Sequence, residues 1–244
     1  MSQICFFGKS DTGLKRKNNE DAFLIRPEAG LMAVADGMGG AAAGEVASQI
    51  FIQAVLETSS KISPQTESEM IHLVQNTFQS ANERILQHVQ EQPQHQGMGC
   101  TAEFIVFGHQ IYALGHVGDS RTYLLRNGQL RQITKDHSVV QDQIDQGLIK
   151  PEEARKHPLR NVILRSVGIR EELALDLIRG KIQPGDLFLL CSDGLTDMID
   201  DASVQEILSS SLSLTQKGEE LIGSALSAGG YDNVTVAMCE VIQP

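Results

Sequence analysis

Residues 31–40 read Leu-Met-Ala-Val-Ala-Asp-Gly-Met-Gly-Gly, a short apolar run that ends at Asp36-Gly37. Apolar residues bounded by turn-forming residues predict a buried strand over 31–35 that stops at the aspartate. A carboxylate directly after a buried strand is costly unless it points into a polar cleft. The stretch therefore predicts a strand that delivers an acid to one edge of a sheet.

The same arrangement recurs along the chain, in Gly118-Asp119, Asp193-Gly194 and Asp232-Asn233. A single pair of this kind has a simpler explanation, since aspartate and glycine are common in turns. Several carboxylates on rigid strand ends would instead form a site for Mg²⁺ or Mn²⁺, with water completing the octahedral coordination. The repeated pattern favours the metal site over a set of unrelated turns.

The intervening segments alternate between hairpin-like strands and pairs of helices. Asn127-Gly128 between apolar runs is a hairpin signal, and Pro184-Gly185 indicates a turn. We expect strands over 4–9, 22–26, 31–35, 173–182, 186–191 and 234–241, a β-meander over 101–134, and helices from Ala41, over 71–89, 202–209 and 216–227. Residues 137–165 look like small helices and loops. This order predicts an α+β fold of antiparallel sheets covered by helices.

Composition narrows the class of protein. The 244 residues contain 41% hydrophobic and 21% charged side chains, typical of a globular chain, and no linker or repeat divides them. The net charge of −11 argues against a nucleic-acid surface. Nothing is long and apolar enough to span a membrane, and residues 1–10 do not resemble a secretory signal, so we expect a cytoplasmic protein. The four separated cysteines predict reduced, mostly buried thiols.

Eight motifs together resemble those of the metal-dependent protein phosphatase (PPM) family in its compact bacterial form. In chain order they lie at Arg16–Asp21, Asp36–Gly40, Gly97–Thr101, His116–Arg121, Asp136–Ser138, His157–Asn161, Ser192–Leu195 and Gly229–Thr235. The resemblance implies a four-layer α-β-β-α sandwich, with two antiparallel sheets flanked by helices and metals at one end. It also implies one catalytic domain over residues 1–244, with a flap at about 136–167 (the flap segment).

The resemblance further implies roles for individual residues. Asp36 would bridge two metal ions, Gly37 would offer its carbonyl oxygen, and Asp193 and Asp232 would complete the pair. Asp119, with Asp193, would hold a weaker third ion. Glu20 and Asp21 would order metal-bound water, which makes them indirect ligands.

The expected activity is hydrolysis of phosphoserine and phosphothreonine in proteins by metal-activated water, with Mg²⁺ or Mn²⁺ as cofactor. Two ions can clamp the phosphate and activate water, so no phosphoenzyme is expected. The expected partners are phosphorylated proteins and a cognate serine/threonine kinase that the enzyme opposes in signalling. We expect a monomer that binds neither nucleic acid nor membrane.

Two further side chains are hypotheses within this scheme. The planar guanidinium of Arg16 suits two phosphate oxygens, although a solvated base in Lys15-Arg16-Lys17 is the simpler alternative. Met38 stands where many eukaryotic members of the family have histidine. His157 in the flap segment could then protonate the leaving group, or it could be purely structural.

Two rival functions remain open from the sequence. Residues 37–42 fit a relaxed GxGxxA dinucleotide motif, with Glu57 about 20 residues on, but the strands do not alternate with helices as a wound sheet requires. A scaffold without catalysis would be expected to lose metal ligands, whereas all four aspartates are present. Both rivals are therefore weaker than the phosphatase.

Overall fold

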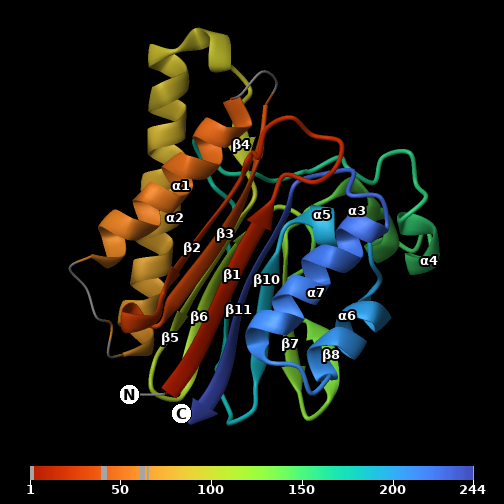
Figure 1. Cartoon of the computed structure of the whole chain (residues 1–244). Coiled ribbons are helices and arrows are strands. Elements are labelled where there is room, and N and C mark those ends of the chain that lie inside the picture. Colours follow the sequence, from red (N-terminus) through yellow and green to blue (C-terminus); the bar gives the residue numbers. More distant parts are fainter. Residues whose placement is uncertain (1–2, 40–42, 61–63, 65, 244) are drawn as a thin grey trace.

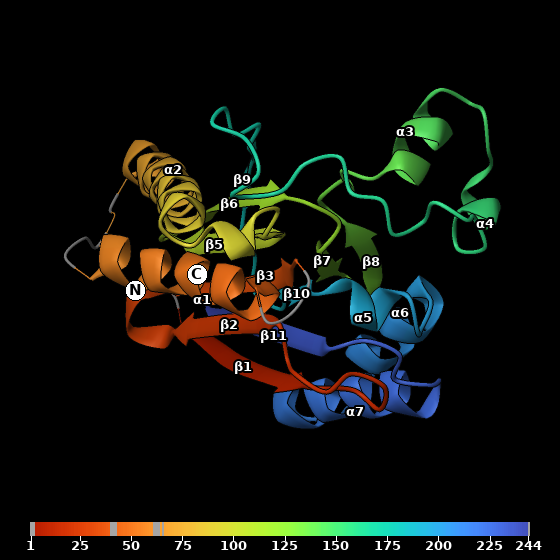
Figure 2. The ribbon, with the colours of Figure 1, turned by 90° about the horizontal axis from the view of Figure 1, so that it is seen from above.

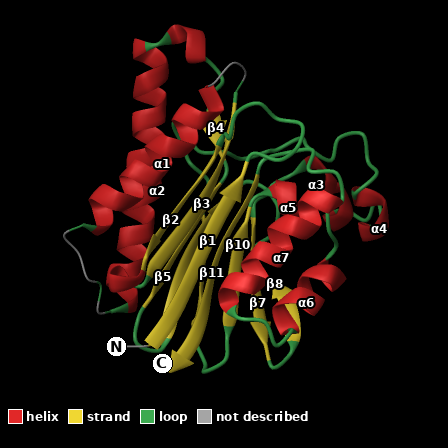
Figure 3. Ribbon diagram, viewed as in Figure 1, coloured by secondary structure: helices red, strands yellow, loops and turns green. Residues whose placement is uncertain are grey.

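Two antiparallel sheets packed face to face form the centre of the molecule in a computed structural model, which describes residues 3–39, 43–60, 64 and 66–243 (Figures 1 and 3). Within these residues the first sheet has the strand order β1 (Gln3–Asp11), β11 (Val234–Gln243), β10 (Leu187–Cys191), β7 (Arg121–Arg126) and β8 (Gln129–Gln132). The second has the order β2 (Asp21–Arg26), β3 (Leu31–Met38), β5 (Ala102–Phe107), β6 (Ile111–Val117) and β9 (Asp176–Lys181), with β4 (Gly99–Cys100) paired to the end of β3.

Helices cover the outer face of each sheet, as the view from above shows (Figure 2). The second sheet carries α1 (Ala43–Ser59) and α2 (Glu67–Glu91), and the first carries α5 (Asp193–Thr196), α6 (Asp201–Ser209) and α7 (Leu214–Ser227). The flap segment contains α3 (Val139–Asp145) and α4 (Pro151–Ala154), which project to one side; short 3₁₀ turns lie at Pro27–Ala29 and Pro93–His95. The predicted four-layer α-β-β-α sandwich is confirmed.

Side chains that alternate along the strands fill each interface between the layers. Alternate residues of the strands, among them Met32, Val34, Phe188 and Leu190, pack between the two sheets. Residues on the opposite faces of the same strands pack against the helices. Burial on both faces explains why β3 and β10 read as continuous apolar runs.

The helices begin where the sequence supplies caps. Thr66 and Glu69 form a reciprocal capping box at the start of α2, and Ser213 and Gln216 form another at α7. These two helices therefore begin at Glu67 and Leu214, before the starts expected at residues 71 and 216. The expected helix start at Ala41 lies outside the described residues, as does part of the 37–42 motif.

The predicted meander over residues 101–134 is wrong in one respect. β6 and β7 are consecutive but belong to different sheets, and the chain crosses between them at Gly118, whose φ is 115°. β9 and β10 likewise flank a turn at Pro184-Gly185 without pairing. Alternation of apolar residues shows which face of a strand is buried but not which sheet the strand joins.

Two smaller differences concern strand ends. β3 continues through Asp36 and Gly37 to Met38 because β4 pairs with its end. β9 begins at Asp176 rather than 173, since Leu173 and Leu175 pack toward the α1–α2 side instead. The Asn127-Gly128 hairpin is confirmed, with both residues at positive φ between β7 and β8.

Cys100, Cys191 and Cys239 are buried and Cys5 is exposed, and all are free thiols, as expected. Among the helices of the described residues, none combines the length and the apolar character that crossing a membrane requires.

Candidate metal centre and active site

A cleft of about 400 Å³ lies at the end of the sandwich where β3, β6 and β10 end and β11 begins. It brings together residues that are up to 217 positions apart along the chain. Its lining consists of Arg16, Glu20, Asp36, Gly37, Met38, Gly39, Thr101, Asp119, Asn161, Ile163, Asp193, Asp232 and Asn233. The cleft thus contains each direct metal ligand that the resemblance implies, together with Arg16 and Glu20.

The carboxylates of the cleft repel one another. Burial, and then the nearby charges of Asp21 and Asp193, raise the pKa of Asp36 well above its usual range. Burial and the charge of Asp119 do the same to the pKa of Asp193. The pKa of Asp119 is raised to about 7 by burial and by the charge of Asp136. Such a cluster is stable in its ionised form only if cations offset the repulsion.

Two carboxylate oxygens at this end of the sandwich are buried without a hydrogen-bond partner, Oδ1 of Asp193 and Oδ1 of Asp21. Buried polar atoms normally have partners, so each exception indicates a missing ligand, ion or water. Within the described residues, no three acidic, histidine or cysteine side chains converge tightly on one point. The possible donors are all oxygen atoms, and they do not by themselves enclose one point. Such a set suits Mg²⁺ or Mn²⁺, which keep several waters in their coordination shell. The residues present therefore fit the implied metals.

Gly37 lies at the closest contact between β3 and α1. A Cβ atom at this position would come within 2.0 Å of the carbonyl oxygen of Gly44, and one at Gly44 would come within 2.7 Å of the carbonyl oxygen of Gly37. The Gly37 amide donates to the carbonyl of Glu20 at 3.1 Å. Only glycine fits at either position, so the backbone of residue 37 can line the cleft directly.

Asp21 lies beneath the cleft and links the two sheets. It is 6% exposed, and its Oδ2 accepts hydrogen bonds from Ser192 Oγ at 2.8 Å and Thr235 Oγ1 at 2.6 Å. Burial raises the pKa of Asp21 to about 6, although both hydroxyl donors lower it. The two hydroxyl contacts hold the side chain in one orientation.

Residues 12–20 and 229–233 form one wall of the cleft, here called the clasp. Asn233 is its centre: the side-chain oxygen accepts from the Glu20 amide at 2.8 Å, and the side-chain nitrogen donates to the carbonyls of Thr12 and Asn18, both at 2.9 Å. Arg16 Nη2 donates to Asp232 Oδ2 at 2.7 Å across the clasp. The Arg16 side chain is 49% exposed and lies over the carboxylates. The clasp therefore holds a cation beside a predicted metal ligand.

The flap segment forms the opposite wall through Asn161 and Ile163. His157 is not among the lining residues; its Nδ1 accepts the amide of Leu159 two residues on, at 3.2 Å. The structure thus leaves His157 away from the cleft, within its own turn.

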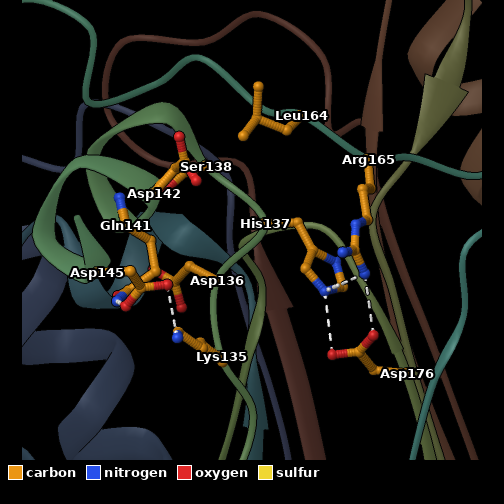
Figure 4. A pocket seen from close by; sticks show the side chains of 10 residues that line it. All are labelled: Lys135, Asp136, His137, Ser138, Gln141, Asp142, Asp145, Leu164, Arg165 and Asp176. Carbon is orange, nitrogen blue, oxygen red and sulfur yellow. Dashed lines mark hydrogen bonds and ion pairs between the residues drawn. The ribbon is translucent and has the colours of Figure 1, made fainter.

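The flap segment joins the sandwich at a neck built from polar contacts. Ser138 and Ile163 form a β-bridge, and the Leu164 amide donates to the His137 carbonyl at 2.7 Å. A pocket of about 200 Å³ opens beside this neck, where Asp176 contacts both His137 (3.2 Å) and Arg165 (2.9 Å) (Figure 4). Burial and the neighbouring His116 lower the pKa of His137 to about 4. His137 is therefore neutral at physiological pH.

A buried network continues from the neck into the sandwich. His116 Nδ1 contacts Glu103, and His116 Nε2 donates to the Lys135 carbonyl at 2.8 Å. Thr122 of the other sheet donates to Glu103 at 2.5 Å. Burial alone would lower the pKa of His116, but the Glu103 carboxylate outweighs it and raises the pKa to about 9. This network links both sheets to the start of the flap segment, and His116 serves in hydrogen bonding.

Several residues of the site were not identified from the sequence. Thr101 Oγ1 accepts from the Asp36 amide at 3.2 Å and hydrogen-bonds Ser120 at 2.6 Å, which positions the central aspartate. Asn233 was quoted only as a turn residue. Asp197 faces Arg160 and lines a neighbouring cavity with Asp119 and Asp193. Thr101 and Asn233 lie within two of the eight motifs, and Asp197 follows the Asp193-Gly194 turn, but these signals assigned no role to any of the three.

Comparison with known proteins agrees with this geometry. The serine/threonine protein phosphatase PstP of Mycobacterium tuberculosis is 40% identical over 237 residues, which is 97% of this chain and 45% of that protein. The serine/threonine phosphatase stp of Listeria innocua is 36% identical over 236 residues, 95% of this chain and 94% of that protein. The chain thus spans about half the length of the mycobacterial relative and nearly all of the Listeria one.

Solved structures share the fold. The crystal structure of Mycobacterium tuberculosis PstP/Ppp has a TM-score of 0.92 and 39% identity, covering 98% of this chain and 99% of that one. The PstP catalytic domain in complex with two manganese ions has a TM-score of 0.90 and 39% identity, again covering 98% and 99%. The profile of the family described as Protein phosphatase 2C matches residues 14–226. With this match over most of its length and a cleft lined by the family's acidic motifs, the chain belongs to the protein phosphatase 2C (PPM) family.

Proposed function

We propose that this chain is a metal-dependent protein phosphatase that hydrolyses phosphoserine and phosphothreonine in proteins. The observation that carries the proposal is the cleft itself, where mutually repelling carboxylates, one with a buried oxygen that lacks a partner, lie beside the cation of Arg16. The relatives named as serine/threonine phosphatases support this substrate class.

Asp36, Asp193, Asp232 and the carbonyl of Gly37 would hold a pair of Mg²⁺ or Mn²⁺ ions. Such ions, when bound, lower the pKa of water and offset the charge of a phosphate ester. The chain supplies rigid oxygen donors: Asp36 through the Thr101 contact, Gly37 through β4, and Asp232 through the clasp. Glu20 and Asp21 would orient water around the pair. Asp119, with Asp193, would contribute to a weaker third site.

Arg16 would bind the phosphate. Its contact with Asp232 places the guanidinium at the mouth of the cleft, and its half-exposed side chain can turn toward an incoming anion. A guanidinium donates to two phosphate oxygens at once, which would hold the ester in one orientation within the cleft. Proton donation by His157 to the leaving group stays a prediction.

The wider assignments form part of the same proposal. The chain would be one catalytic domain whose flap segment, residues 136–167, borders the active site. It would act in the cytoplasm as a monomer and oppose a cognate serine/threonine kinase in signalling.

The proposal is tested by phosphate release from p-nitrophenyl phosphate and from a phosphothreonine peptide in the presence of Mn²⁺. We expect Asp36→Asn and Asp193→Asn to lower kcat by at least about 10³-fold, since each removes a charged metal ligand. Glu57→Gln, an exposed acid on α1, is the matched control and should leave kcat unchanged. Manganese uptake is measured separately by calorimetry. A native protein that takes up no manganese, or fully active aspartate variants, would favour the non-catalytic scaffold.

A further inference from the structure

Exposed large apolar side chains are frequent in the two segments that form the walls of the cleft. Among the residues that the structure describes, ten such side chains are exposed, and six belong to the clasp or the flap segment: Leu14, Leu148, Leu159, Val162, Leu164 and Tyr231. These two walls make up less than a quarter of the chain. Single exposed apolar residues are ordinary, but a pair held together beside residues that line a site indicates a binding surface.

Leu14 and Tyr231 are the two of these side chains that belong to the clasp, and they are 63% and 61% exposed. The two loops that carry them are joined, because the Leu14 amide donates to the Gly230 carbonyl at 2.8 Å. Gly13 also packs so closely on Asp232 that a Cβ atom would lie 2.1 Å from its carbonyl oxygen. The backbone beneath both side chains is therefore held in place, and we call the pair the apolar ledge.

The apolar ledge lies directly beside the predicted phosphate contact. Leu14 is two residues from Arg16, and Tyr231 precedes Asp232, to which Arg16 is bound. Since consecutive Cα atoms are about 3.8 Å apart, the Cα of Leu14 lies within about 8 Å of the Cα of Arg16, and the Cα of Tyr231 about 3.8 Å from that of Asp232. Across the cleft, Leu159 and Val162 flank the lining residue Asn161. These apolar residues are thus sequence neighbours of cleft-lining residues on both walls, where residues flanking a bound phosphoserine or phosphothreonine would come close.

We propose that the apolar ledge binds a large apolar side chain next to the phosphorylated serine or threonine of the protein substrate. This inference rests on the proposed phosphatase function and adds a specificity determinant to it. Two side chains cannot supply the roughly 800 Å² that each partner buries in a stable dimer, which argues against a second copy as occupant. They do suffice for one leucine-sized side chain, whose burial strengthens binding without touching the metals.

The experiment compares two phosphothreonine peptides that differ only in having leucine or serine on both sides of the phosphothreonine, with p-nitrophenyl phosphate as a substrate without flanking residues. The native protein should show a kcat/KM about tenfold higher for the leucine peptide. The double variant Leu14→Ser/Tyr231→Ser should reduce that ratio to near one, mainly through KM, and leave p-nitrophenyl phosphate hydrolysis unchanged. The unchanged reaction also shows that the variant is folded.

Leu212→Ser is the matched control, because Leu212 is an exposed leucine just before the first turn of α7, whereas the ledge lies beyond its last turn. It should keep the native peptide ratio. The ledge proposal would be overturned if the native protein hydrolysed both peptides at equal rates, or if the double variant kept the native peptide ratio. In either case, turnover of p-nitrophenyl phosphate would still support the phosphatase function. Absence of turnover with every substrate would instead overturn the phosphatase and the ledge with it. A concentration-dependent loss of the peptide ratio would indicate that a second copy covers the ledge, which would also contradict the proposal.

Discussion

The two walls of the cleft are attached to the sandwich in different ways. The clasp is held by Asn233, a 4% exposed side chain whose hydrogen bonds reach three backbone groups and connect the first residues of the chain to the last. The flap segment is attached through polar contacts at its neck and through two arginines. Arg155 donates to the carbonyls of Thr196 and Ile199, and Arg160 faces Asp197. The helices α3 and α4 of the flap segment project away from the sheets (Figure 2). One wall is tied to the sandwich by a nearly buried asparagine, and the other is held by polar and partly exposed contacts.

This difference indicates a division of roles. Metal ligands and the phosphate-binding arginine need positions fixed to within fractions of an ångström, which a clasp built into both sheets can provide. A projecting segment with exposed side chains tolerates changes in sequence and suits contacts with variable substrates. Removing Asn233, the side chain that ties the clasp together, should therefore affect chemistry and folding together, whereas substitutions at the flap neck should have smaller and more separable effects.

The largest effect is expected for Asn233→Ala. It leaves three partly buried backbone groups without their side-chain partner, at up to about 1 kcal/mol each, so the free energy of unfolding should fall by up to about 3 kcal/mol. Phosphatase activity should fall at least about 100-fold, because Glu20 and Asp232 lose their support. Urea unfolding and steady-state kinetics measure the two effects. Asn76→Ala, an exposed residue on α2, should change neither, and a native-like Asn233→Ala would show that the clasp does not depend on this side chain.

A second effect is expected for Arg16→Ala, which removes the cation but not the clasp. KM for p-nitrophenyl phosphate should rise by about 10- to 30-fold, as for the loss of a charge-assisted bidentate contact, with a smaller change in kcat. Manganese affinity measured by calorimetry should be retained. The neighbouring Lys17→Ala serves as control and should behave like the native protein. A fall in kcat with unchanged KM would place Arg16 in the chemical step instead.

At the flap neck, the His116–Glu103 pair should make stability depend on pH. The pKa of His116 is raised to about 9 in the folded protein, so the contribution of this residue is fully present below its unfolded pKa of about 6.5 and is lost as pH rises through 9. The native protein should thus lose on the order of 1–3 kcal/mol between pH 7 and 10 relative to His116→Gln. Denaturant titrations at several pH values measure this loss, and parallel curves for the two proteins would contradict it.

The smallest effect is expected for Arg165→Ala, which removes the half-exposed partner of Asp176 at the neck. Exposed ion pairs contribute about 0–1 kcal/mol, so stability should change by less than about 1 kcal/mol, and KM for a phosphopeptide by less than about threefold. Arg179→Ala, which breaks the exposed pair with Glu67, provides a control of the same type. A loss as large as that of Asn233→Ala would show that the two walls are equally integrated.

Much of this arrangement was predictable because local signals agreed with the tertiary structure. The acid after each buried strand identified Asp36 and Asp193, and the Asn127-Gly128 turn located the β7–β8 hairpin. The crossing of the chain between sheets at Gly118 was not predictable, since sheet membership depends on long-range pairing and not on residue period. The hydrogen bonds of the clasp and of the Glu103–His116 network were missed for the same reason. Their partners are far apart in the sequence or lie on neighbouring strands, and a single polar residue carries little sequence signal.

The short strand β4 has neighbours on both sides. Cys100 pairs with Gly37 at the end of β3, and its amide and carbonyl also bond to Val167 at the end of the flap segment. Cys100 thus connects Gly37, whose carbonyl is expected to bind metal, with Val167, where the flap segment ends. Occupancy of the metal centre and the position of the flap should consequently influence each other through a shared backbone, and any such influence must be equal in both directions.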